Sequence, residues 1–276
     1  MIFTYKKWRK FCAELQKAGW QSRPACEVEA SLSDYVVLKH DVETAVKHAF
    51  DIAKIEHEYG HRGSYYVQAY LLNNSQNVAL LQQMRDMGHE ISYHYDVLDA
   101  CKGDLDAAID EFDKSKARFE ECGFPLVTVC QHGNPVVERV GYTSNRDFFR
   151  SERVRERYPT VADVMVNFQE QRGTTYRYFS DAGRQFKHIY DPLNNDVVDS
   201  ADRDVVYADL EALFGSLEQG GRYIISIHPH RWTRSAWLYR MKNAAFHMIR
   251  AVAKLLIKIP LFKKVMSRYY YLAKKI

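Results

Sequence analysis

Short apolar runs and amphipathic stretches alternate along the first 232 residues of the chain. Seven runs of four to six residues are typical of buried strands, at 35–40, 64–68, 89–94, 126–130, 163–166, 176–179 and 223–227. The amphipathic stretches between them predict helices over 44–59, 75–88, 104–122 and 204–218. This alternation is typical of parallel strands joined by helical crossovers, and therefore of an α/β fold.

The number of predicted strands limits the architecture. Seven are too few for a standard eight-stranded barrel, so they suit a smaller or distorted barrel, or an open sheet. The stretch 133–159 is long and irregular. Because so long a connection is rarely idle in a compact domain, we expect it to be a substrate loop.

Polar, titratable residues lie where five of the predicted strands end. They are Asp41 and Glu43 after the first strand, His94 at the third, His132 at the fourth, Asp181 at the sixth and His228 at the seventh. The carboxyl ends of parallel strands in a barrel meet on one face, where catalytic groups collect. Carboxylates and imidazoles together suit a divalent metal, and a metal with an open position makes its bound water acidic.

Each of these residues also suits a purely structural role. Asp41 and Glu43 favour the N-terminus of a following helix, and His94 suits a hydrogen-bonded place in the core. His132 and His228 suit turns at strand ends. His89 falls on the opposite face of its strand from His94, so it is assigned a structural role.

Several motifs resemble the polysaccharide deacetylase family, the carbohydrate esterases that include chitin and peptidoglycan deacetylases. The motifs are Lys39-His-Asp-Val-Glu43, Gly88-His-Glu-Ile-Ser-Tyr-His-Tyr-Asp96 and Ile227-His-Pro-His230, and 129–135 and 178–184 look similar too. The likeness covers roughly residues 35–232 and is closest to divergent bacterial members with a His-Asp-Val-Asp first motif. It implies a distorted (β/α)7 barrel and metal-dependent removal of an N- or O-acetyl group from a sugar in polysaccharide or cell-envelope glycan synthesis.

The resemblance also implies roles for single residues. Asp41 is the expected general base and His228 the general acid, while Glu43 and His94 are the expected metal ligands. The family usually has aspartate at the position of Glu43. Leu98 stands where the family has its second metal-binding histidine, and leucine cannot bind a metal.

Other residues are expected to complete this site. His132 is predicted to replace the missing ligand, with Asp96 in reserve, and Zn²⁺ is the preferred metal. Asp181 and Arg184 are expected to orient Asp41 or the sugar. Tyr66 and Trp232 are expected to stack on a sugar ring.

The sequence is also compatible with two other classes of function. The absent second histidine favours a non-catalytic sugar-binding or scaffold protein with a degenerate site. The His228-Pro-His230 spacing favours a metal-dependent phosphoesterase. The buried polar cluster argues against the first, because an idle site has little physical reason to keep such groups.

The charge of the chain is unevenly distributed, which divides it into a domain over 1–232 and a tail over 233–276. From Arg231 to the end there are 12 Lys and Arg and no Asp or Glu. The rest of the chain holds 27 basic and 35 acidic residues, a net charge of −8. The tail therefore favours an acidic surface as its partner.

The tail is predicted to begin with an amphipathic helix over 236–259, which Pro260 ends. Basic and polar residues from Arg240 to Lys258 share one face, and apolar residues the other. The helix could pack on the barrel or lie on an anionic membrane surface. No nucleic acid is expected as a partner, because no binding motif accompanies the charge.

The remaining composition bears on where the protein works. The five cysteines are scattered and include no CxxC pair, which is typical of reduced thiols in a cytoplasmic protein. No run of 18 uncharged apolar residues occurs, and no secretory signal is recognisable at Met1. We expect a cytoplasmic protein, for which the tail leaves open a peripheral position at the inner face of the membrane.

Overall fold

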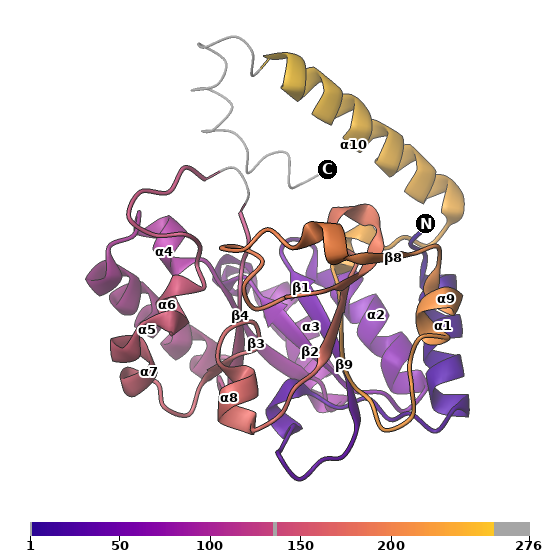
Figure 1. The fold of residues 1–276 in the computed structure, drawn as a ribbon, viewed down its shortest axis with the longest axis horizontal. Coiled ribbons are helices and arrows are strands. Elements are labelled where there is room, and N and C mark those ends of the chain that lie inside the picture. The colour runs from indigo at the N-terminus through magenta and orange to yellow at the C-terminus, as the bar shows by residue number, and fades with distance from the viewer. Residues whose placement is uncertain (1, 135–136, 257–276) are drawn as a thin grey trace.

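The computed structural model describes residues 2–134 and 137–256, and Figure 1 shows their arrangement. The strands of these residues form one nine-stranded mixed sheet in the order β5-β4-β3-β2-β1-β9-β6-β7-β8. Seven are parallel, namely β5 (Ala162–Asp163), β4 (Thr128–Gln131), β3 (Glu90–Tyr95), β2 (Gly63–Val67), β1 (Tyr35–Val42), β9 (Arg222–Ile227) and β6 (Arg177–Ser180). They correspond to the seven predicted strands, so the α/β class is confirmed.

Amphipathic helices cover the outer face of the parallel strands. They are α2 (Val46–Glu58), α3 (Ser75–Asp86) and α5 (Leu105–Glu121), as the sequence predicts within a few residues. The Asn74 side chain caps α3 through the backbone N–H of Gln76 at 2.9 Å, and Asp104 caps α5 through that of Ala107 at 3.1 Å. These crossovers bring the carboxyl ends of the strands to one edge of the sheet.

Shorter elements connect this framework. They are η1 (Ala25–Glu27), η2 (Ala69–Asn73), α4 (Val97–Ala100), α6 (Asp147–Arg150), α7 (Glu152–Arg157), α8 (Phe168–Arg172), η3 (Ala182–Arg184), η4 (Ala201–Arg203) and η5 (Pro229–Arg231). The predicted substrate loop therefore contains two helices. Phe148 and Phe149 of α6 are fully buried against α5, so part of this stretch belongs to the core.

Three features differ from the sequence prediction. Helix α1 (Tyr5–Lys17) was not predicted, although it buries Trp8 and Phe11 on one face. The antiparallel strands β7 (Phe186–Ile189) and β8 (Val205–Tyr207) extend the sheet beyond β6. The helix predicted over 204–218 shrinks to α9 (Leu210–Phe214), because β8 pairing takes its first residues and Asp209 caps the helix after them.

The inner face of the sheet is concave. Val164, just after β5, and Tyr178 of β6 lie in the same apolar cluster as Val37 of β1. Tyr176, just before β6, donates a hydrogen bond to the Val164 carbonyl at 2.5 Å. No backbone ladder joins β5 to β6 in the described ranges, so the sheet curls without closing.

The chain leaves the sheet after β9 and forms α10 (Ala236–Leu256), which confirms a helix over most of the predicted range. Figure 1 shows it running along the outside of the molecule. Residues 257–276, the rest of the predicted tail, lie outside the described ranges. Among the helices described, none is both long and apolar enough to cross a bilayer.

Candidate metal centre

The polar residues at the strand ends meet at one edge of the sheet. Strand β1 supplies Asp41 and leads into Glu43, β3 supplies His94, β4 leads into His132, and β9 leads into His228. Ion-pair distances connect them: His228 Nε2 lies 3.8 Å from Asp41 Oδ2 and 3.8 Å from Glu43 Oε1, and His132 Nε2 lies 3.6 Å from Glu43 Oε1. The two expected acid–base residues and the three expected ligands therefore form one cluster.

Strand alternation directs Asp41 into this cluster together with Lys39, for which the sequence motifs predict no role. Lys39, two positions earlier on β1, is fully buried, and its Nζ donates to both oxygens of Asp41 at 2.5 and 2.6 Å. It also donates to Ser226 Oγ on the neighbouring β9 at 3.3 Å. Burial acts to raise the pKa of Asp41, but Lys39, His94 and His228 hold it well below its usual range. Asp41 is thus an ionised, fixed carboxylate.

Glu43, His94 and His132 have the geometry of a metal site. One ligand atom from each lies within 4.8 Å of the others, which is close enough for a single ion to bind all three. The pKa of Glu43 is well below its usual range, because His132 and His228 outweigh the opposing effect of burial. Burial lowers the pKa of His94 to about 3, so this imidazole is neutral at physiological pH.

A hydrogen bond fixes the tautomer of His94. Its Nδ1 lies 3.0 Å from the carbonyl oxygen of Cys130, and a carbonyl only accepts, so Nδ1 carries the proton. The lone pair is then on Nε2. Such an outer hydrogen bond is the usual way in which proteins orient a metal-binding histidine. The donor set and its tautomer therefore fit a divalent metal such as Zn²⁺.

The structure explains how this centre accommodates Leu98. Leu98 lies on α4 and is buried in the apolar cluster on the outer side of the sheet. His132 instead approaches from the adjacent strand end, where the His94 and His132 rings pack edge to face at 5.1 Å. Its main chain is fixed on both sides, by Tyr95 O at 2.7 Å and by Asn145 Nδ2 at 2.9 Å.

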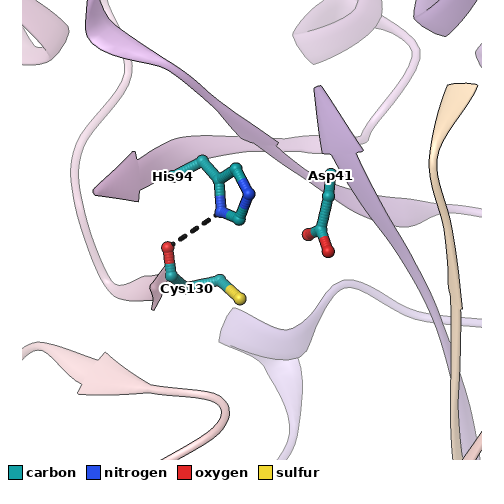
Figure 2. Close-up of side chains that lie close together, drawn as sticks. All are labelled: Asp41, His94 and Cys130. Atoms are coloured by element: carbon teal, nitrogen blue, oxygen red, sulfur yellow. Dashed lines mark hydrogen bonds between the residues drawn. The ribbon is translucent and has the colours of Figure 1, made fainter. Parts of the chain in front are cut away.

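A second, deeper group shares His94 with the first. Asp41, His94 and Cys130 also offer ligand atoms within 4.8 Å of one another, and Figure 2 shows their side chains converging. The Lys39 ammonium already neutralises Asp41 there, so a metal ion would meet a positive charge at hydrogen-bond distance from one of its ligands. Burial also raises the pKa of the Cys130 thiol well above its usual value, and thiols bind metals as thiolates. The shallower group is the better metal centre.

Asp181 has a different task from the expected one. It is fully buried and accepts hydrogen bonds from the His228 backbone N–H at 3.1 Å, from His228 Nδ1 at 2.5 Å and from Trp232 Nε1 at 3.2 Å. Arg231 donates to it as well, at 3.1 Å. Asp181 therefore fixes the His228 ring with Nε2 directed at Asp41 and Glu43, rather than orienting Asp41 or a sugar directly.

The three other residues predicted to contact the substrate lie elsewhere. Trp232 is fully buried, stacked on Phe3 at 5.1 Å, and Tyr66 is fully buried with its hydroxyl 2.7 Å from Thr128 Oγ1. Neither ring offers a face to a sugar, so both stacking assignments are wrong. Arg184 Nη1 donates to Asn243 of α10 at 3.4 Å, so it contacts the tail helix.

Besides Lys39, two other residues lie near the centre although the sequence motifs predict no function for them. They are Cys130 and His230. Cys130 is paired with His94 in the β3–β4 register. The His230 ring packs edge to face on that of His228 at 5.9 Å, and burial lowers the pKa of His230 to about 3 although nearby Glu43 raises it. Period-two alternation along β1 was the signal for Lys39, because it places the one lysine of an apolar strand on the face of Asp41.

Comparisons of the chain with models of protein families, with curated proteins and with solved structures find no match. Support for a function therefore comes from the residues of the site and from the resemblance of their motifs.

Proposed function

We propose that the chain is a metal-dependent hydrolase that removes an N- or O-acetyl group from a sugar, on a distorted barrel of the polysaccharide deacetylase type. The observation that carries the proposal is that His228 Nε2 lies 3.8 Å from both Asp41 Oδ2 and Glu43 Oε1, and that Glu43 is grouped with His94 and His132. A base, an acid and a three-residue metal site in one cluster are the groups that acyl hydrolysis needs.

Glu43, His94 and His132 would hold the metal. A bound divalent ion, Zn²⁺ by preference, would supply Lewis acidity to the acyl carbonyl and to a water molecule. Asp41, ionised throughout the neutral range, accepts the proton of the attacking water. Lys39 keeps the carboxylate at a fixed position, so little reorganisation is needed at the moment of reaction.

His228 supplies the proton to the leaving nitrogen or oxygen. Its Nδ1 bonds Asp181 at 2.5 Å, which leaves Nε2 as the atom that faces the reaction site. The negative charge of Asp181 stabilises the imidazolium that this role requires, as the carboxylate does in other His–Asp pairs. The base and the acid reach the site from neighbouring strands β1 and β9.

The fold supports the same proposal. Seven parallel strands curl around one inner cluster, as expected for a distorted barrel that lacks full closure. The resemblance of the His40-Asp41-Val42-Glu43 and His228-Pro229-His230 motifs assigns the same ends of strands to catalysis.

Acetate release from N-acetylated and O-acetylated oligosaccharides tests this proposal, with the Zn²⁺-loaded full chain. Asp41→Asn is expected to keep the metal and lose at least about 100-fold in kcat, because an amide cannot accept the proton. Asp86→Asn, an exposed aspartate outside the site, is the matched control and should leave kcat unchanged. Sugar binding without acetate release by the metal-loaded protein would favour the scaffold function, and phosphate release from phosphate esters would favour the phosphoesterase.

A further inference from the structure

Two described side chains of α10, those of Tyr239 and Asn243, contact the body of the protein. Tyr239 is buried, with its ring edge-on to Phe3 at 5.7 Å, and Asn243, one turn later, accepts the hydrogen bond of Arg184. Residues four apart share a helix face, so these two define the face that turns toward the body.

Three large apolar side chains in the described part of the helix lie on the other face. Trp237, Met241 and Met248 are 68%, 52% and 65% exposed. At about 100° per residue these three fall in an arc of roughly 40°, roughly opposite Tyr239. An amphipathic helix that packs on its own domain turns its apolar side inward. Here the three described apolar side chains are turned away from the body, which indicates an external apolar partner.

The charge near Trp237, Met241 and Met248 indicates which kind of partner this face binds. Arg240 of the same helix is exposed, about 60° around the helix from Trp237, and the sequence from Arg231 onward contains no acidic residue. A second copy of the chain would oppose this helix with another of the same sign, and no carboxylate of either helix could compensate. Nucleic acid would match the charge but not the Trp and Met side chains. A membrane surface with anionic headgroups matches both.

We propose that α10 docks the protein on an anionic lipid surface, with Trp237, Met241 and Met248 in the headgroup–acyl boundary and the basic residues at the phosphates. The helix follows η5, which begins just after His228, and Arg184 ties it to the segment that carries Asp181. A bilayer bound there lies next to the strand ends that form the candidate site. Binding itself does not depend on catalysis.

Co-sedimentation of the full chain with vesicles tests the inference. Vesicles of phosphatidylcholine alone are compared with vesicles that contain phosphatidylglycerol. The wild-type chain should pellet with the anionic vesicles only, and rising salt should release it. Trp237→Ser should weaken partitioning on the order of tenfold. Arg240→Gln should weaken it roughly fivefold, the worth of one basic residue near an anionic surface.

Matched controls separate this surface from others. Gln219→Glu adds one negative charge on the exposed loop before β9, at the opposite strand ends, and should leave partitioning almost unchanged. Unchanged partitioning of Trp237→Ser, or equal binding of neutral vesicles, would overturn the proposal. So would a wild-type dimer that Trp237→Ser converts to a monomer in sedimentation equilibrium. Vesicle binding by a chain that releases no acetate would keep the inference and reject the proposed hydrolase.

Discussion

The Nζ of Lys39 lies 2.5 and 2.6 Å from the two carboxylate oxygens of Asp41, and both residues project from the same face of β1. The pair is buried, so neither charge is strongly screened by solvent. The lysine thereby sets the ionisation and the position of the proposed base at once. Sequence spacing alone, two residues along one strand, is enough to create this arrangement.

Removing the lysine should shift the pH dependence of the reaction. Lys39→Met takes away a positive neighbour that lowers the pKa of Asp41, so this pKa rises. Because a base works only when deprotonated, the acidic limb of kcat/KM should move upward by roughly 1–3 pH units. Ser226→Ala removes only a neutral contact of Lys39 and should leave the limb in place. An unmoved limb in Lys39→Met would mean that another residue is the base.

Unfolding in urea provides the control for this variant. Loss of one partner from a buried ion pair costs about 3–5 kcal/mol, because the other charge stays buried. The double variant Lys39→Met with Asp41→Leu leaves no charge behind and should recover a large part of that loss. Simple additivity of the two single changes would show that the pair is not coupled.

Metal content should distinguish the two ligand groups that share His94. His132→Ala removes a ligand of the shallower group and should weaken Zn²⁺ binding by at least about 100-fold, more than the usual effect of an outer-shell change. Cys130→Ala removes a ligand of the deeper group only and should leave binding close to wild type. Elemental analysis and competition with a chelator measure both. If Cys130→Ala weakened Zn²⁺ binding more than His132→Ala, the metal site would instead be Asp41, His94 and Cys130.

Asp181 should affect turnover far more than binding. Asp181→Asn leaves His228 without its anionic partner, so kcat should fall on the order of 100-fold or more, with KM and metal content nearly constant. Trp232→Phe removes a neutral donor to the same carboxylate and should lower kcat much less. Steady-state kinetics on both variants check this. A change in KM alone would assign Asp181 to substrate binding, as the sequence suggested.

Acidification should destabilise the fold through His89. This ring accepts a hydrogen bond from Gly63 N–H at Nδ1, at 3.0 Å, and burial lowers its pKa to about 4. The unfolded chain binds the proton near pH 6.5, so stability contributed by the neutral ring is present above that pH and is lost as pH falls toward 4, by on the order of 2–3 kcal/mol.

Urea midpoints between pH 7 and 4.5 measure this effect. The wild-type midpoint should fall more steeply than that of His89→Gln, which cannot take up the proton. Burial raises the pKa of Asp163 to about 6, so protonation of this carboxyl increases the stability of the fold as pH falls from 6 to 3.8. This opposite effect is the same in wild type and in His89→Gln, so it does not alter the comparison. If the urea midpoints of the two proteins fell in parallel with pH, His89 would be excluded as the cause of the acid destabilisation.

The sequence predicted those parts of the structure that depend on local pattern. Apolar runs identified the seven parallel strands, and their order put Asp41, His94 and His228 at one edge. It did not predict β8, because Val205 and Val206 have exposed side chains and form a strand only by pairing with β7. The burial of Trp232 could not be predicted from local sequence either, because its packing partner Phe3 is more than 200 residues away in the chain.

The position of β1 in the sheet has a consequence for how the protein is made. β1 lies between β2 and β9, so one of its edges stays unpaired until residues 222–227 have left the ribosome. Pairing over so long a separation closes late and slowly. Until then, the nascent chain carries an exposed, apolar strand edge that can pair with other chains. Premature termination anywhere before β9 should therefore yield an aggregating fragment rather than a smaller folded domain.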